Sequence, residues 1–235
     1  MTGLYLIGSA HKNRASKKKL EKIYEILKPE VLLSEVSEEE ISLFNESLLP
    51  LLLKLPKDMP KEKIMEYVNS LRESYFGFEY SFNQAYARDH GIRNNCVDKF
   101  DLANAVGIKE GIEDLIRIIN SGFDISEYLK KRKQKDKSQG ELKKEFEAYT
   151  RLNGTEDLDK KLREPDNARQ LERDICMEKK VRKLYDKTKT VVGVFGAVHT
   201  LDSPSGLTLY SKLRDLNPRV FLLTYRINYK NLSNN

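Results

Sequence analysis

The amino-acid sequence predicts an α/β protein with a mixed, largely parallel central sheet, flanking helices and a helical lid. Short apolar runs at residues 4–7, 31–35 and 191–195 have the length of buried strands. Between them lie longer segments with apolar residues at helical spacing, and short links join the first strand, helix and second strand, as in a parallel pair. A chain of 235 residues can bury one full core, so we expect a single domain over residues 1–235.

The first helix and the second strand follow directly from local signals. Ser16 is a candidate cap for a helix that ends before a proline. The apolar face of this helix comprises Leu20, Ile23, Tyr24 and Leu27. The strand at 31–35 ends in Glu35, and Ser37 and Glu40 then have the spacing of a capping box for the next helix.

The stretch from about 38 to 86 is helical, is broken near its prolines, and is expected to cover the functional site as a lid. Its helical pattern continues to Gly91, where His90 lies beside the helix C-cap and needs no catalytic role. A short strand then ends at Asp98, which is a second acid after a strand.

The C-terminal half contains one long helix, expected from 167 to 185 with Asp166 as its cap. A lysine-rich stretch at about 128–154 has few apolar residues and is expected to be a peripheral insertion. The remaining expected elements are helices at 102–119 and 205–213 and strands at 191–195 and 219–225.

One short motif occurs near each end of the chain. Residues 6–11 read Leu-Ile-Gly-Ser-Ala-His, and residues 194–199 read Val-Phe-Gly-Ala-Val-His. In each copy an apolar run ends in a glycine (Gly8, Gly196), which permits a sharp turn or a close approach of the backbone. A histidine (His11, His199) follows three residues later, near the strand end where α/β proteins usually have their clefts. Two such strands side by side would bring the two imidazoles together.

Arg173 continues the apolar stripe of Met177, Val181 and Leu184 on the long helix. Burying an unpaired charge costs roughly several kcal/mol of folding free energy, so this arginine needs a partner. Two interpretations remain open: Arg173 faces an anionic site, or its long stem carries the charge past the core to water.

The candidate site residues are His11, Glu35, Asp98, Arg173 and His199. Two imidazoles and a carboxylate are a ligand set for a catalytic metal, which predicts His11, Glu35 and His199 as ligands and Glu35 as part of the catalytic machinery. The residue types admit zinc, manganese, cobalt or iron. Asp98 is then a candidate general base, and Arg173 a candidate for stabilising an oxyanion. The histidines could also act as acid and base without a metal, or simply pack at the strand ends.

Composition limits the classes of partner. The net charge is +6, and the cluster of basic residues at 130–137 has no interleaved aromatic residue, which favours a solvated segment over a nucleic-acid site. The chain has two distant cysteines, no secretory leader, and no apolar run of the roughly 18 residues that a membrane span needs. We therefore expect a cytoplasmic protein that acts on a peptide or a small molecule, without a membrane or nucleic-acid partner. A homo-oligomer is compatible with the sequence.

In these motifs the sequence resembles the TraB/GumN superfamily, also called Tiki-like, whose hallmark is a G-x-x-H motif near each end. The resemblance includes the phrase from Pro29 to Glu35, the segment at 87–99, and Arg173-Asp174-Ile175-Cys176-Met177 ahead of the second motif. It spans nearly the whole chain apart from the lysine-rich stretch. It implies a metal-dependent peptidase-like fold, with manganese or cobalt supporting activity and the motif histidines and the glutamate in the site.

The sequence thus predicts a metal-dependent hydrolase that most simply cleaves a peptide bond. No Walker loop, dinucleotide-binding glycine fingerprint or G-x-S-x-G elbow is present, which disfavours P-loop and serine-hydrolase functions. Two alternatives remain open: a peptide-binding or sequestering protein without turnover, and a metal-independent, esterase-like hydrolase.

Overall fold

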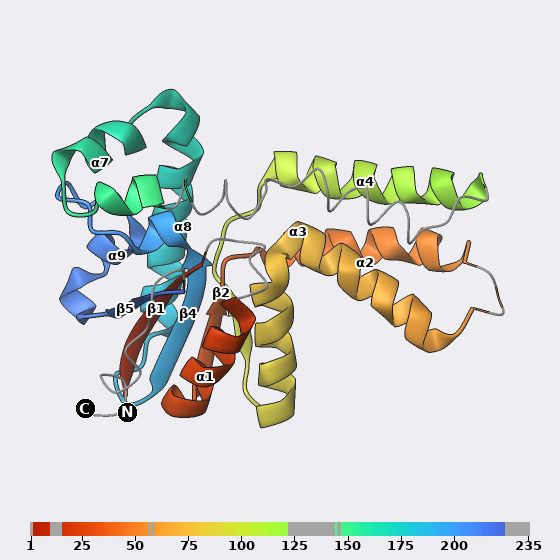
Figure 1. Cartoon of the computed structure of the whole chain (residues 1–235), viewed down its shortest axis with the longest axis horizontal. Coiled ribbons are helices and arrows are strands. Elements are labelled where there is room, and N and C mark those ends of the chain that lie inside the picture. The colour runs from red at the N-terminus through yellow and green to blue at the C-terminus, as the bar shows by residue number, and fades with distance from the viewer. Residues whose placement is uncertain are drawn as a thin grey trace.

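The computed structural model describes residues 2–9, 16–55, 57, 59–121, 144 and 147–223. The strands are β1 (Gly3–Ser9), β2 (Val31–Ser34), β3 (Asn94–Cys96), β4 (Thr190–Gly196) and β5 (Arg219–Leu222). The α-helices are α1 (Lys17–Leu27), α2 (Glu38–Leu52), α3 (Lys61–His90), α4 (Leu102–Asn120), α7 (Glu156–Leu162), α8 (Ala168–Leu184) and α9 (Leu209–Lys212). The 3₁₀ turns are η2 (Pro165–Asn167), η3 (Ala197–Thr200) and η4 (Arg214–Leu216). These elements confirm the α/β class (Figure 1).

Over the described residues the five strands form one sheet in the order β3-β2-β4-β1-β5. Every strand pair in it is parallel, so the sheet is more regular than the mixed, largely parallel arrangement that the sequence predicts. The strands of the two repeated motifs, β1 and β4, are direct neighbours, paired from Gly3 opposite Thr190 to Ser9 opposite Gly196. The two motif strands thus lie side by side, which is the condition for the two motifs to share one site.

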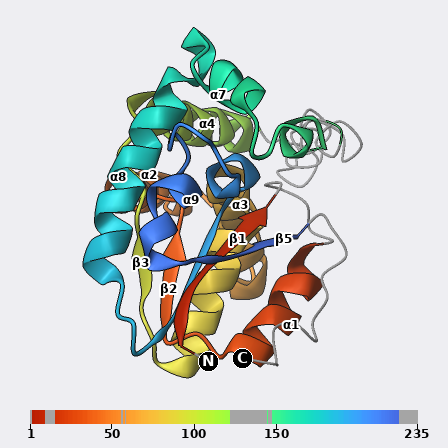
Figure 2. The ribbon, with the colours of Figure 1, turned by 90° about the vertical axis from the view of Figure 1, so that its left-hand side faces the viewer.

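Helices cover both faces of the sheet (Figure 2). One face is packed by α1 and the C-terminal part of α3, where Tyr5 and Ile7 of β1 contact the buried side of α1. The other face is packed by α8 and α9, where Leu4 and Leu6 contact apolar residues such as Met177. Alternate side chains of β1 thus enter two different cores, as expected for a strand buried on both sides.

The carboxyl ends of β1 and β4 form a topological switch point of the sheet. The chain leads from β1 to α1 on one face of the sheet, and from β4 to α9 on the other face. Ligand sites of open α/β sheets lie where the connections that follow two neighbouring strands leave toward opposite faces of the sheet, as they do here. Both G-x-x-H motifs begin at this edge of the sheet.

A helical arm formed by α2, the N-terminal part of α3 and α4 projects sideways from the sheet (Figure 1). It has its own apolar core, which includes Phe44, Leu71 and Ile112. Inside α3, Gly77 adopts φ 77° and ψ 163°, a backbone conformation that essentially only glycine adopts. This break separates the arm segment of α3 from the segment that packs on the sheet. Most of the predicted lid at about 38–86 therefore belongs to the arm, while its last residues pack on the sheet. The covering role of the lid stays a prediction.

The helix starts agree in part with those expected. The Ser37 side chain accepts the backbone N–H of Glu40 at 3.0 Å, and the Glu40 carboxylate accepts the backbone N–H of Ser37, so the predicted capping box is confirmed. The same carboxylate also accepts the backbone N–H of Asp101 at 3.2 Å. Ser16 occupies the N-cap position of α1 without a side-chain cap bond. Asp166 is not the cap of the long helix, because Pro165 starts the turn η2 and α8 begins only at Ala168.

The basic cluster at 130–137 lies outside the described residues, as does most of the expected insertion at 128–154 and the end of the last expected strand beyond residue 223. Both cysteines, Cys96 and Cys176, are free thiols, as predicted. None of the helices in the described part of the chain combines the length and apolar character that a bilayer span requires.

Candidate active site

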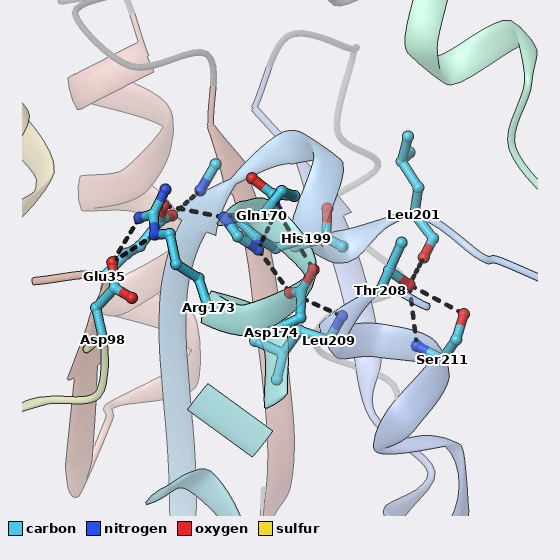
Figure 3. Close-up of polar contacts among 12 residues, drawn as sticks. Glu35, Asp98, Gln170, Arg173, Asp174, His199, Leu201, Thr208, Leu209 and Ser211 are labelled. Atoms are coloured by element: carbon cyan, nitrogen blue, oxygen red, sulfur yellow. Dashed lines mark hydrogen bonds and ion pairs between the residues drawn. The ribbon is translucent and has the colours of Figure 1, made fainter. Parts of the chain in front are cut away.

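Three predicted site residues come together at the carboxyl edge of the sheet (Figure 3). Glu35 directly follows β2, Asp98 follows β3 by two residues, and His199 lies in the turn η3 that continues β4. The Glu35 and Asp98 side chains are each 6% exposed and that of His199 is 3% exposed. Parallel pairing of the strands thus collects residues that are far apart in the sequence.

Arg173 of α8 binds both carboxylates. Its Nε donates to Asp98 Oδ2 at 2.9 Å, and its Nη2 donates to Glu35 Oε1 and to Asp98 Oδ2. Burial disfavours the guanidinium charge, but Glu35 and Asp98 outweigh this and raise the pKa of Arg173 above its ordinary value. Of the two interpretations left open by the sequence, the anionic partner is confirmed, and the partners are the two site carboxylates.

His199 lies between two carboxylates. Its Nε2 is 3.0 Å from Glu35 Oε1, and its Nδ1 is 2.6 Å from Asp174 Oδ1. Burial by itself disfavours the imidazolium, but the charges of Glu35 and Asp174 outweigh it and raise the pKa of His199 to about 10. The two carboxylates thus favour a protonated ring, and a metal on Nε2 would have to displace that proton. The Gln170 amide nitrogen also lies 2.6 Å from Nδ1 and 3.0 Å from Nε2.

Asp174 was missed by the sequence analysis, which selected its neighbour Arg173. Its side chain is fully buried, and besides His199 it accepts the backbone N–H of Leu209 at 3.0 Å and the Gln170 amide at 3.3 Å. A signal was present: Asp174, Met177 and Val181 follow one another at steps of three and four and are the buried residues of α8. An acid in a buried stripe needs a specific partner, just as Arg173 does.

The glycines of both motifs have structural roles at this site. The Gly196 backbone N–H donates to Glu35 Oε2, which fixes the glutamate against β4. A Cβ at Gly8 would lie 2.5 Å from both Thr200 Oγ1 and Leu222 Cδ2, and 3.3 Å from Ala197 Cα. Gly8 of the first motif therefore allows the turn that carries His199 to pack closely against β1.

His11 lies outside the described residues, so its predicted meeting with His199 is untested. The chain reaches this region from Ser9, which ends β1 opposite Gly196 and is buried. The Ser9 hydroxyl donates to Glu79 of α3, a buried acid that sequence reasoning also missed. The third histidine, His90, is exposed at the end of α3, where it stacks on Tyr86 away from the site, as expected.

The donor set fits a divalent metal in part. Within the described ranges no three His, Cys, Asp or Glu side chains converge on one point. The distance of 3.0 Å from Glu35 Oε1 to His199 Nε2 is nevertheless that of two adjacent ligands of one ion with bonds of about 2.1 Å. The carboxylate of Asp174 on the other ring nitrogen is the usual orienting partner of a metal-binding histidine. The carboxylates of Glu35, Asp98 and Asp174 gather around Arg173 and His199, and this concentration of negative charge favours a cation.

Comparison of the chain with protein-family models, curated proteins and solved structures finds no match. Membership of the TraB/GumN superfamily therefore remains a prediction that rests on the sequence motifs.

Proposed function

We propose that this protein is a metal-dependent hydrolase, most simply a peptidase. The observation that carries the proposal is the arrangement of His199, with Glu35 beside Nε2 and a buried Asp174 on Nδ1. The resemblance of the paired motifs to the TraB/GumN superfamily supports the same class. The two free thiols agree with the reducing cytoplasm as its compartment.

In this proposal His11, Glu35 and His199 hold the divalent metal, with manganese or cobalt favoured and zinc compatible with the donors. Such a metal, when bound, polarises a carbonyl and makes water a better nucleophile. Asp174 keeps the imidazole in one orientation with Nε2 directed at Glu35.

Asp98 and Arg173 supply the remaining chemistry. Asp98 accepts a proton from the attacking water as general base. The Arg173 side chain is 24% exposed, against 6% for each of its two carboxylate partners, so it is the member of this group that a substrate reaches first. A guanidinium in this position stabilises the negative charge that develops on a carbonyl oxygen during hydrolysis.

The first alternative is a peptide-binding protein without turnover. It is compatible with the mutual pairing of Glu35, Asp98 and Arg173, since ion pairs that satisfy one another need take no part in catalysis. The second alternative is a metal-independent hydrolase, in which a carboxylate such as Asp98 is the base. The carboxylates beside His199 raise its pKa, which suits the ring to act as the acid in that alternative. Activity that persists in chelator would favour it.

The test is hydrolysis of casein and a mixed peptide library by protein loaded with manganese, cobalt or zinc, and by protein kept in chelator. The variants are His11→Ala, His199→Ala and Glu35→Gln, with His90→Ala as the matched control because His90 is exposed outside the site. We expect the first three to lose at least about 100-fold in rate and the control to keep the parent rate. Full activity of the His199 variant, or full activity in chelator, would contradict the proposal.

A further inference from the structure

A groove of about 640 Å³ lies between α4, the loop that follows β3, and the N-terminal part of α8. This volume is in the usual range for ligand sites. Its lining includes Phe100, Leu102 and Val106, whose exposed fractions are 42%, 70% and 46%. Large apolar side chains gathered in a hollow and left in contact with water are typical of a binding site.

The groove borders the candidate active site. Lys99 directly follows Asp98, and Glu172 directly precedes Arg173. The Lys99–Glu172 ion pair on the groove wall therefore joins the same two segments as the Asp98–Arg173 pair of the site. A ligand in the groove lies next to the residues that we propose to act on a carbonyl group.

The charges of the groove argue against an anionic ligand. Its two cations, Lys99 and Arg169, are each paired with a carboxylate of the same groove, Glu172 and Asp101. Glu110 adds a third carboxylate to the lining. Phosphates and nucleic acids therefore meet no net positive charge here, whereas a neutral apolar group meets apolar walls.

We propose that this groove binds a large apolar side chain of a peptide substrate, beside the Asp98–Arg173 pair. The proposal rests on the proposed function for the cleavage step, while binding in the groove requires neither metal nor turnover. Gly107 lines the groove, and a Cβ added there meets no atom within 4 Å, so the groove can be filled from this position without a clash.

The chain contains no tryptophan, so a tryptophan in a peptide is a selective fluorescent probe. We would titrate protein in chelator into an end-blocked pentapeptide with one tryptophan between two pairs of glycines, and follow fluorescence anisotropy. Gly107→Leu fills the groove and Val106→Asp places a charge in it. The matched controls are Gly107→Ala, which adds one methyl group, and Leu49→Asp, which changes an exposed leucine of the arm outside the groove.

We expect the parent to bind with a Kd of about 1 mM or tighter, Gly107→Leu and Val106→Asp to bind at least about tenfold more weakly, and both controls to stay within about twofold of the parent. Peptides with leucine or phenylalanine at the central position should displace the probe, and a glutamate peptide should not. Absence of parent binding up to about 5 mM, or equal binding by parent and both groove variants, overturns the proposal.

The two proposals fail in different ways. Binding in the groove without hydrolysis under any metal loading contradicts the hydrolase and leaves the groove assignment intact. Metal-dependent hydrolysis, together with probe binding that is equally tight in the parent and in both groove variants, contradicts the groove assignment alone. Circular dichroism and thermal unfolding show whether each variant is folded. A loss of probe binding in a folded variant is then due to the change in the groove.

Discussion

Replacing Gly8 by alanine is expected to destabilise the protein, although alanine is normally tolerated in a strand. The added Cβ would lie 2.5 Å from Thr200 Oγ1 and from Leu222 Cδ2, distances that packed atoms do not adopt. Thr200 cannot simply rotate away, because its hydroxyl donates to the Ala197 carbonyl at 2.8 Å within the turn that carries His199. The substitution therefore strains the contact between the first motif and the second.

The magnitude follows from three contributions. An extra methyl group in a packed interior costs about 1–3 kcal/mol. Loss of the hydrogen bond from Thr200 to Ala197 costs about 1 kcal/mol. Alanine loses less backbone entropy than glycine on folding, and this raises the free energy of unfolding by about 0.5–1 kcal/mol. The expected net loss in free energy of unfolding is about 2 kcal/mol.

Urea denaturation followed by circular dichroism measures this loss. With a slope of about 2 kcal/mol per molar urea, the midpoint should fall by about 1 M. Gly107→Ala is the matched control: Gly107 lies in α4 with open space around its Cβ position, so alanine should raise stability by up to about 1 kcal/mol. An unchanged or higher midpoint for Gly8→Ala would refute the close approach of the two motifs.

Three further outcomes are expected. Asp174→Asn should weaken metal binding by about 10- to 100-fold in calorimetric titration, because the ring of His199 loses its charged orienting partner, whereas Glu178→Gln on the same helix should leave binding unchanged. Burial raises the pKa of Cys96 to about 12, so its thiol should resist alkylation at pH 9 in the native protein and react once the protein is unfolded. The measurement uses a Cys176→Ala protein, in which Cys96 is the remaining cysteine. Fast alkylation of the native variant would contradict this expectation. Gly77→Ala should lower the free energy of unfolding by about 2 kcal/mol in the same urea assay, because its φ of 77° is unfavourable for alanine, and an unchanged midpoint would argue against the break in α3.

The parts of the fold that follow from local patterns could be predicted from the sequence. Apolar runs located β1, β2 and β4, and the acids at the strand ends, Glu35 and Asp98, lie at the sheet edge as expected. Pairing between β1 and β4 could be proposed because the two runs carry the same motif, yet only the tertiary structure gives the register.

Other features depend on contacts that the sequence does not display. The spacing of Asp174 with Met177 and Val181 indicates a buried acid that needs a partner, but that this partner is His199 appears only in the tertiary structure. Gly77 is an isolated glycine in a helical stretch and so permits a break, but its positive φ appears only in the structure. That break separates the arm from the segment of α3 that packs on the sheet, a division within the expected lid that only the structure shows.

The central claim is that the two motif histidines and Glu35 bind one divalent metal, and direct titration of manganese, cobalt or zinc into metal-free protein tests it most directly. The account predicts that the parent binds about one equivalent, that His11→Ala and His199→Ala each lose it, and that His90→Ala retains it. No binding by the parent, or binding by the His199→Ala protein as tight as by the parent, would contradict the account.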